Sequence, residues 1–307
     1  MDDSHWMTRW LGPICVGGMM AVYGTYYLLL APQELKFDPA SLRDVKHLVL
    51  WGSSSLVLSL VMLWSLGISL LVMRHYRGLL GRREWRAVLT IGGIVIVGMV
   101  LLLIFNPGFV GSKASDAILG PLFNAKPRVQ LVVNTANGVG IPLSLFLLVA
   151  CVLVSRRVSS CSATELGERI RWFRTLLYSA GAFLAALIYE VFRLYQWGAS
   201  LSPSGESLEP GGERAGLASS LTLASGLIFS GFMALVFLPT AIQLDHREDA
   251  LVSAAASAEA KFDRATWAMV HRIEESPLTA LGSYVAVLLP MLTGVLTKVL
   301  EAWVHLE

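Results

Sequence analysis

Six long apolar runs restrict this chain more than any other feature of its sequence. A helix needs about 20 residues to cross about 30 Å of hydrocarbon, because each residue adds about 1.5 Å. Runs of that length lie at roughly 11–31, 48–73, 87–105, 129–154, 175–197 and 216–243. Only 15% of the 307 residues are charged, whereas soluble domains average about 25%. We therefore predict an all-α fold, a multi-pass transmembrane helical bundle whose six spans occupy residues 1–243.

The distribution of arginine predicts the side of the membrane on which each connection lies. Cytoplasmic loops of membrane proteins carry an excess of Lys and Arg. The connections 74–86 and 155–174 contain five arginines each, and the segment after the sixth run carries Arg247, Lys261, Arg264 and Arg272. The alternate connections are poorer in basic residues, and 198–215 contains Arg214 alone. This alternation predicts a multi-pass protein of the bacterial inner membrane with a cytoplasmic N-terminus.

The fourth run contains two amide side chains, Asn134 and Asn137. A polar group in hydrocarbon needs a hydrogen-bond partner, because leaving it unsatisfied is costly. The two residues are three positions apart and therefore share one face of a helix. The amides either line a hydrated path or bond neighbouring helices. On the first interpretation, both are candidate pore-lining residues.

The fifth run is the one that carries charge within its length, on Glu190 and Arg193. Ionisable side chains inside a membrane are costly and usually face protein or water. Their spacing of three residues allows an ion pair on one helix face. They lie about one turn inside the outer interface, beside Tyr195 and Trp197. We therefore weigh a charged ring at the outer mouth of a pore against an ion pair that reaches the interface.

The sixth run contains small and hydroxyl-bearing residues at helical spacing. Thr222, Gly226 and Ser230 recur every four positions, and Ser225 lies among them. Stripes of small residues commonly allow close packing of membrane helices. Small hydroxyl residues can also line a hydrated pore without blocking it. Thr222 and Ser225 are therefore further pore-lining candidates.

Tryptophans stand among the arginines of the two basic connections, and this combination suggests a binding surface. The candidates are Arg82 and Arg83 beside Trp85, and Arg169 and Arg171 beside Trp172. Guanidinium groups with aromatic rings can hold a nucleotide, a nucleic acid or an anionic lipid. The alternative is that the arginines reflect only the orientation of the chain in the membrane.

Helices are also expected outside the six runs. The connection 106–128 is apolar enough for a short helix over 114–123, lying on the outer leaflet or dipping into it. Residues 244–307 form the predicted cytoplasmic region. One helix is expected over 245–275, either separate from the sixth run or continuous with it, and another begins at Ser276-Pro277. The last helix, 278–304, has an apolar stripe that suggests an amphipathic cytoplasmic helix, and a seventh span is the alternative.

No motif of an enzyme is recognisable. The chain lacks a metalloprotease motif, a nucleophile elbow and a phosphate-binding loop. Its three cysteines are isolated from one another and suggest neither a disulfide framework nor a metal site. We expect no catalytic activity, no metal and no cofactor.

The end of the chain resembles the tail of some uncharacterised bacterial multi-pass proteins. The sixth run ends in Phe237-Leu238-Pro239, a charged helix follows, and then come Ser276-Pro277 and Leu289-Pro290. The broad layout of spans plus a cytoplasmic helical sensor is similar to that of some small membrane effectors of antiphage defence, such as the channel subunit of Hailong-type systems. The resemblance implies an oligomeric ion channel that depolarises the cell under control of a nucleotide or oligonucleotide.

These features together predict an oligomeric membrane pore gated from the cytoplasmic side. The expected partners are membrane lipid, at least two further copies of the chain, and an anionic cytoplasmic ligand. A small-solute transporter and a non-transporting sensor or assembly protein are the alternatives.

Overall fold

Every regular element that the structure describes is a helix. The computed structural model describes residues 39–76, 110–155, 162–200, 213–258, 262–271 and 277–304, together with the single positions 78, 81, 86, 90 and 273. Within these residues there is no strand, so the prediction of an all-α fold is confirmed for this part of the chain. The predicted spans 11–31 and 87–105 lie outside the described residues, apart from Thr90.

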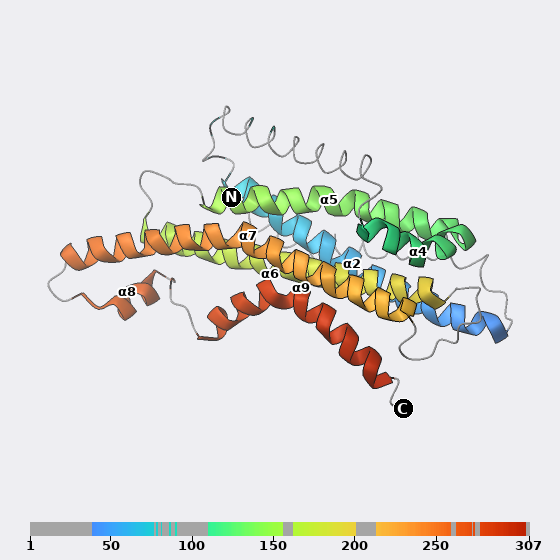
Figure 1. Cartoon of the computed structure of the whole chain (residues 1–307). Coiled ribbons are helices and arrows are strands. Elements are labelled where there is room, and N and C mark those ends of the chain that lie inside the picture. The colour runs from blue at the N-terminus through green and yellow to red at the C-terminus, as the bar shows by residue number, and fades with distance from the viewer. Residues whose placement is uncertain are drawn as a thin grey trace.

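Four long helices correspond to predicted spans and run side by side (Figure 1). They are α2 (Pro39–Tyr76), α5 (Pro127–Ser155), α6 (Ala163–Ser200) and α7 (Glu213–Ala258). Three stretches are long and apolar enough to cross a membrane, judged by length and composition: Lys46–Tyr76, Ala163–Ser200 and Gly216–Ala258. Two further apolar stretches, Leu143–Ser155 in α5 and Gly282–Leu296 near the chain end, are shorter. The length and composition of these three stretches are consistent with a membrane protein.

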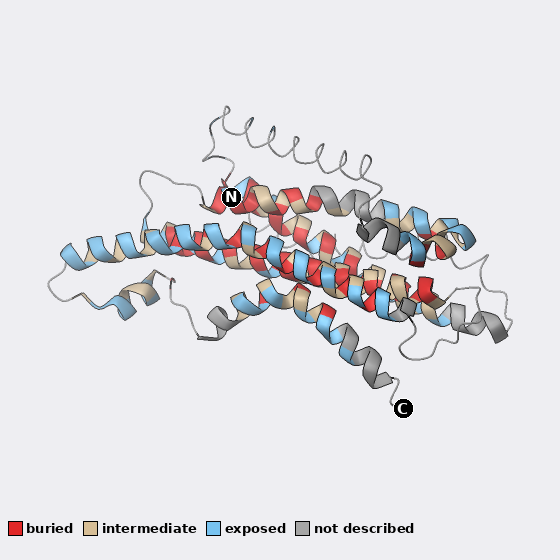
Figure 2. Cartoon of the chain, viewed as in Figure 1, coloured by how far each residue is buried: buried red, intermediate tan, exposed pale blue. Residues whose placement is uncertain are grey.

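Helix α7 is much longer than a membrane is thick. It has 46 residues, which corresponds to about 69 Å at about 1.5 Å per residue. Exposed residues predominate at its free end (Figure 2). The helix predicted over 245–275 is continuous with the sixth run as far as Ala258, where α7 ends, and a separate helix, α8, spans Arg264–Val270. Asp263 starts α8 by accepting hydrogen bonds from the backbone N–H groups of Ala265 and Thr266, the usual role of an N-cap.

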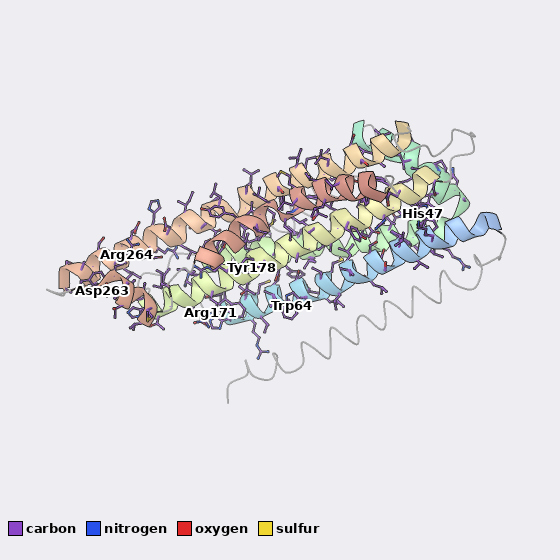
Figure 3. All side chains as sticks on the ribbon, turned by 90° about the horizontal axis from the view of Figure 1, so that it is seen from below. His47, Trp64, Arg171, Tyr178, Asp263 and Arg264 are labelled. Atoms are coloured by element: carbon purple, nitrogen blue, oxygen red, sulfur yellow. The ribbon has the colours of Figure 1, made fainter. Side chains whose placement is uncertain are left out.

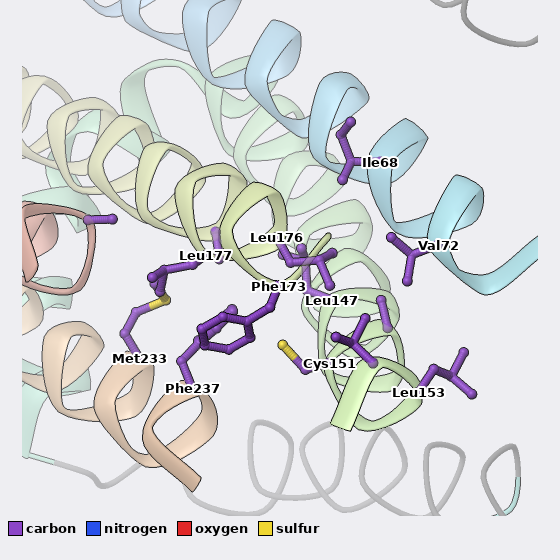
Figure 4. Packing of buried hydrophobic residues seen from close by; sticks show 14 of the residues in the cluster. Ile68, Val72, Leu147, Cys151, Leu153, Phe173, Leu176, Leu177, Met233 and Phe237 are labelled. Carbon is purple, nitrogen blue, oxygen red and sulfur yellow. The ribbon is translucent and has the colours of Figure 1, made fainter. Parts of the chain in front are cut away.

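One hydrophobic core joins most of the helices. Buried side chains of α2, α5, α6 and α7 interlock at its centre (Figure 4). Phe173 of α6 and Phe237 of α7 lie with their ring centroids 5.8 Å apart, and Cys151 of α5 is buried beside them. Ile273, which follows α8, belongs to the same cluster. The segment after α7 therefore folds back onto the bundle.

Helix α9 (Pro277–Val304) packs along α6 and α7. It begins at the predicted residue, because Pro fits the first turn of a helix. Figure 1 shows it bent near its middle, where Pro290 stands. A Cβ placed on Gly181 of α6 would stand 2.6 Å from the carbonyl oxygen of Ala286, and one on Gly226 of α7 would stand 2.8 Å from that of Pro290. Helix α9 thus approaches both neighbours backbone to backbone, within the fifth and sixth apolar runs.

Helix α4 (Val110–Ala125) covers one end of the bundle, which we call the α4 end. It contacts α5, α6 and α7 and buries Ile118 and Leu122 against Trp197. The carbonyl oxygen of Ile118 approaches to 2.6 Å from the position of a Cβ on Gly198, so glycine is required there. The helix predicted within 106–128 is present. We call the opposite end, where α8 lies, the α8 end; Asp263, Arg264 and Arg171 lie toward it in Figure 3, and His47 toward the other.

Candidate functional site

A buried carboxylate between α2 and α6 is the main polar feature of the interior. Glu190 is only 5% exposed. The indole Nε1–H of Trp51 donates a hydrogen bond of 2.6 Å to its Oε1, and the hydroxyl of Ser55 donates one of 3.3 Å to the same oxygen. Both contacts join residues far apart in the sequence. We call Glu190, Trp51 and Ser55 the carboxylate site.

The local sequence of α2 explains why two donors meet this carboxylate. Trp51 and Ser55 are four residues apart and therefore share one face of α2. That face packs on α6, with which α2 makes the most extensive helix pairing among the described elements. Trp51 is fully buried, as expected for an indole whose N–H has found a partner. The packing of α2 on α6 thus positions both donors.

Within the part of the chain that the structure describes, the carboxylate site has no compensating positive charge. Among the residues that the structure describes, no Lys, Arg or His forms an ion pair with Glu190. Its two donors are neutral groups. Moving an ionised carboxylate out of water is costly unless it is paired. A proton or a bound cation would remove that cost. Both neutral donors bond Oε1, so Oε2 is the oxygen on which we expect the proton or cation to bind.

The carboxylate site is closed at the α4 end of the bundle. The rings of Trp51 and Trp197 lie with centroids 5.8 Å apart, and the ammonium group of Lys126 lies 5.7 Å from the ring of Trp197. Helix α4 packs over this tryptophan layer. Glu190 precedes Trp197 by seven positions, about 10 Å along a helix. The carboxylate therefore lies well inside the bundle and not at its rim.

Arg193 does not pair with Glu190, contrary to the prediction. Its guanidinium donates to the hydroxyl of Tyr189 at 2.9 and 3.1 Å and to Oε1 of Gln196 at 3.0 Å. It also stacks over the rings of Tyr189 and Phe192. The two charged side chains leave α6 in different directions, because Glu190 points toward α2.

The uncharged pore-lining candidates do not gather at the carboxylate site. Asn134 is exposed on α5, and the side chain of Asn137 lies outside the described residues. Thr222 is buried and donates to the carbonyl of Ala218 at 2.9 Å, and Ser225 donates to that of Leu221 at 2.8 Å. These hydroxyls are satisfied within their own helix.

The assignment of Arg169 as a ligand-binding residue requires correction. Arg169 has no exposed surface. Its guanidinium pairs with Glu165 at 2.8 Å, donates to the carbonyl of Val154 at 3.2 Å and lies 5.3 Å from the ring centroid of Tyr76. The guanidinium N–H groups therefore point inward, toward the C-terminal end of α5. A positive charge at that end of a helix complements the helix dipole.

The other arginine candidates have different outcomes. Arg171, two positions further along α6, is exposed at the α8 end. It remains a candidate for an anionic ligand. Arg82 and Arg83 lie outside the described residues.

Sequence reasoning missed the partners of both buried charges. Trp51 and Ser55 could have been noticed as polar groups on one face of an otherwise apolar run. Arg247, which donates to the carbonyl of Ser155 at 2.6 Å, had been counted only as an orientation signal. It joins Arg169 in capping α5, and no local pattern distinguishes a capping arginine from a surface one.

The carboxylate site suits a proton or a monovalent cation. Within the described part of the chain, no three His, Cys, Asp or Glu side chains come close enough to hold a metal ion. A divalent cation normally requires several oxygen or nitrogen ligands with compensating charge. One carboxylate with two neutral donors matches a single positive charge.

Comparisons with protein-family models, with curated proteins and with solved structures find no match for this chain.

Proposed function

We propose that this protein is an oligomeric ion channel of the membrane, and that Glu190 binds the proton or small cation that passes. The observation that carries the proposal is the burial of one carboxylate inside the fifth apolar run, bonded by two neutral donors. An ionisable group at that depth is costly, and such groups commonly mark ion pathways.

The tryptophan layer would control access to Glu190. Trp51, Trp197 and α4 cover the carboxylate at the α4 end. An ion leaving Glu190 toward that end would have to displace one of these groups. In the proposed channel this layer would keep the path closed, and opening would require a movement of α4 or of α2 against α6.

The membrane arrangement that we propose has at least six spans in the bacterial inner membrane, with the N-terminus in the cytoplasm. Arginine-rich connections 74–86 and 155–174 support this orientation. It places the α8 end of the bundle in the cytoplasm and the α4 end outside. Residues 244–258 of α7 then project into the cytoplasm, since α7 exceeds the thickness of the membrane.

We propose a homo-oligomer of three or more subunits. The polar candidates of one protomer do not form a continuous path among the described residues. Asn134 is exposed on α5, where a neighbouring subunit could complete a hydrated path. Native mass spectrometry of the detergent-solubilised protein tests this point, and a monomer under all conditions would contradict it.

Gating by an anionic cytoplasmic ligand, a nucleotide or nucleic acid, is part of the proposal. Arg171 is exposed at the cytoplasmic end, and Arg82 and Arg83 belong to the neighbouring basic connection. Depolarisation of the cell in antiviral defence would be the biological outcome. Titration of nucleotides during flux measurements, with Arg171→Ala as the variant, tests the ligand.

Ion flux into proteoliposomes tests the channel directly. Wild-type protein is compared with Glu190→Gln, which keeps the shape and the acceptor oxygen but cannot ionise. Glu168→Gln is the matched control on the same helix, because Glu168 is half-exposed and contacts His75 at 3.3 Å. We expect Glu190→Gln to lower proton or sodium flux at least tenfold and Glu168→Gln to leave it unchanged.

Two results would overturn the proposal. One is the absence of wild-type flux under every ligand and voltage condition. The other is wild-type flux through Glu190→Gln. Elution of both variants at the wild-type volume in size-exclusion chromatography verifies that they are folded.

A further inference from the structure

We infer that α9 is an additional transmembrane helix, whose outer face contacts lipid acyl chains and which carries the C-terminus to the outside. This inference rests on the proposed membrane arrangement and replaces the cytoplasmic position expected for 278–304. Its 28 residues span about 42 Å at about 1.5 Å per residue. That length is sufficient to cross the hydrocarbon.

Three close contacts fix the depth of α9. Ala286 lies against Gly181 in the fifth apolar run, Pro290 against Gly226 in the sixth, and Gly294 against Leu223, also in the sixth. Reading along α9, the contacts on α7 move from residue 226 to residue 223. Helix α9 therefore runs antiparallel to α7 and parallel to α6, from the cytoplasmic end toward the outer end.

The contact at Pro290 is suited to an apolar surrounding. Proline disrupts the hydrogen-bond ladder of a helix and leaves backbone groups that need other partners. The hydroxyl of Ser230 accepts a hydrogen bond of 3.0 Å from the backbone N–H of Met291. Thr293 donates to the carbonyl of Leu289 at 2.8 Å. In a membrane such groups must be satisfied within the protein, and small or hydroxyl residues commonly do this between helices.

The apolar stripe of α9 faces away from the bundle. Its described buried residues are the small or compact Ala286, Pro290 and Gly294, and the partly buried Val287 also packs against the core. The exposed large apolar residues are Tyr284, Val285, Leu288, Leu292, Val295, Leu296 and Val299. An amphipathic helix in water buries its large apolar side chains. In α9 the large apolar side chains point outward instead, and the helix lies against the fifth and sixth apolar runs. This arrangement matches a helix whose outer face is covered by acyl chains.

The exposed face of α7 supports the same environment. Within the sixth run, Leu235 is 78% exposed and Ile228 is 63% exposed. These side chains lie on the helix that α9 follows. In a membrane, acyl chains would cover the outward faces of α7 and α9 at the same depth. In water, both faces would expose a large apolar surface to solvent.

Cysteine labelling of the full chain tests the inference. Cys15, Cys151 and Cys161 are first replaced by Ala, and single cysteines are then introduced as Ser204→Cys, Ala256→Cys and Glu307→Cys. Intact cells are treated with a membrane-impermeant maleimide before and after permeabilisation. We expect positions 204 and 307 to react in intact cells and position 256 to react only after permeabilisation.

The outcomes separate this inference from the membrane arrangement on which it rests. If position 307 reacts only after permeabilisation, as position 256 does, while position 204 reacts in intact cells, α9 does not cross the membrane and the inference is overturned. If positions 204 and 256 react from the same side, the six-span arrangement itself is wrong. A cysteine-free parent that retains wild-type elution shows that the replacements preserve the fold.

Discussion

Helix α6 buries two charged side chains, and their surroundings differ in kind. Near the α8 end, Arg169 meets the carboxylate of Glu165, the carbonyl of Val154 and the ring of Tyr76. Near the α4 end, Glu190 meets the neutral donors of Trp51 and Ser55. Among the described residues the cation has a charged partner, whereas the anion has none.

This difference separates a structural charge from a functional one. A buried charge with a full set of partners stabilises one packing arrangement and has no capacity for another ligand. A buried carboxylate with neutral partners needs a positive charge from elsewhere. Arg169 therefore fixes the end of α5, and Glu190 is the residue that we expect to exchange an ion.

The largest effect on stability should follow removal of Arg169. Arg169→Ala leaves the carboxylate of Glu165 and the carbonyl of Val154 without their partner, so we expect a loss of about 3–5 kcal/mol in the free energy of unfolding. Chemical denaturation in detergent measures it. Arg171→Ala, an exposed position on the same helix, is the control and should change stability by less than about 0.5 kcal/mol. Equal losses of stability for Arg169→Ala and Arg171→Ala would contradict the assignment of Arg169 as a structural charge.

The packing of α9 gives a second, smaller effect that is independent of either charge. Gly226→Ala places a methyl group 2.8 Å from the carbonyl oxygen of Pro290, and overpacking of this kind costs about 1–3 kcal/mol. Gly231 lies on the same helix with no atom within 4 Å of the added Cβ. Gly231→Ala should therefore stabilise α7, by up to about 1 kcal/mol. Thermal unfolding of the two variants and the wild type measures these effects. The unfolding temperature should fall for Gly226→Ala and rise for Gly231→Ala.

Glu190→Gln should change stability much less than Arg169→Ala. The amide oxygen of glutamine can still accept from Trp51 and Ser55, and no ion pair is lost, so we expect a change within about 1 kcal/mol. The same unfolding measurement checks this value. A loss as large as that of Arg169→Ala would show that Glu190 is a structural charge, which would contradict the comparison.

The smallest effect concerns α8, which lies outside the proposed membrane. Hydrogen bonds from the Thr266 hydroxyl, and from the backbone N–H groups of Ala265 and Thr266, hold the pKa of Asp263 below its usual range. A carboxyl group whose pKa is lowered by folding stabilises the folded state above its unfolded-state pKa and loses that effect as the pH falls. Amide exchange of α8, corrected for intrinsic rates, should therefore accelerate below about pH 4.

The variant Asp263→Asn tests the cause of this pH dependence. Asparagine is also a good N-cap but does not titrate in this range. Its α8 amides should exchange with no acceleration at low pH. Acceleration equal to that of the wild type would assign the effect to another group.

Local patterns in the sequence predicted the helices well. Apolar runs predicted α2, α5, α6 and α7, and Ser276-Pro277 predicted the start of α9. These features depend on residues close together in the chain. The helix predicted over 245–275 is helical to Ala258 and again from Arg264, and the N-cap Asp263, which is also a local signal, marks the second start.

Long-range contacts could not be predicted in the same way. Glu190 was identified as a candidate, but its expected partner was Arg193, and its actual donor Trp51 is 139 positions away. Arg169 was expected on the surface with Arg171, yet it points inward to α5. The apolar stripe of α9 allows both a cytoplasmic packing face and a seventh span, because a helical pattern does not reveal whether water or lipid surrounds the helix.

A hydrophobic carbodiimide tests most directly whether Glu190 carries a proton inside the bundle. The reagent enters from lipid, and a protonated carboxyl group adds to it and rearranges to a stable acylurea that mass spectrometry of peptides can locate. We predict modification of Glu190 at neutral pH and none of the water-exposed Glu168, with sodium ions slowing the reaction at Glu190 if they compete for the site. An unmodified Glu190, in membranes where the reagent is shown to be active, would contradict the account.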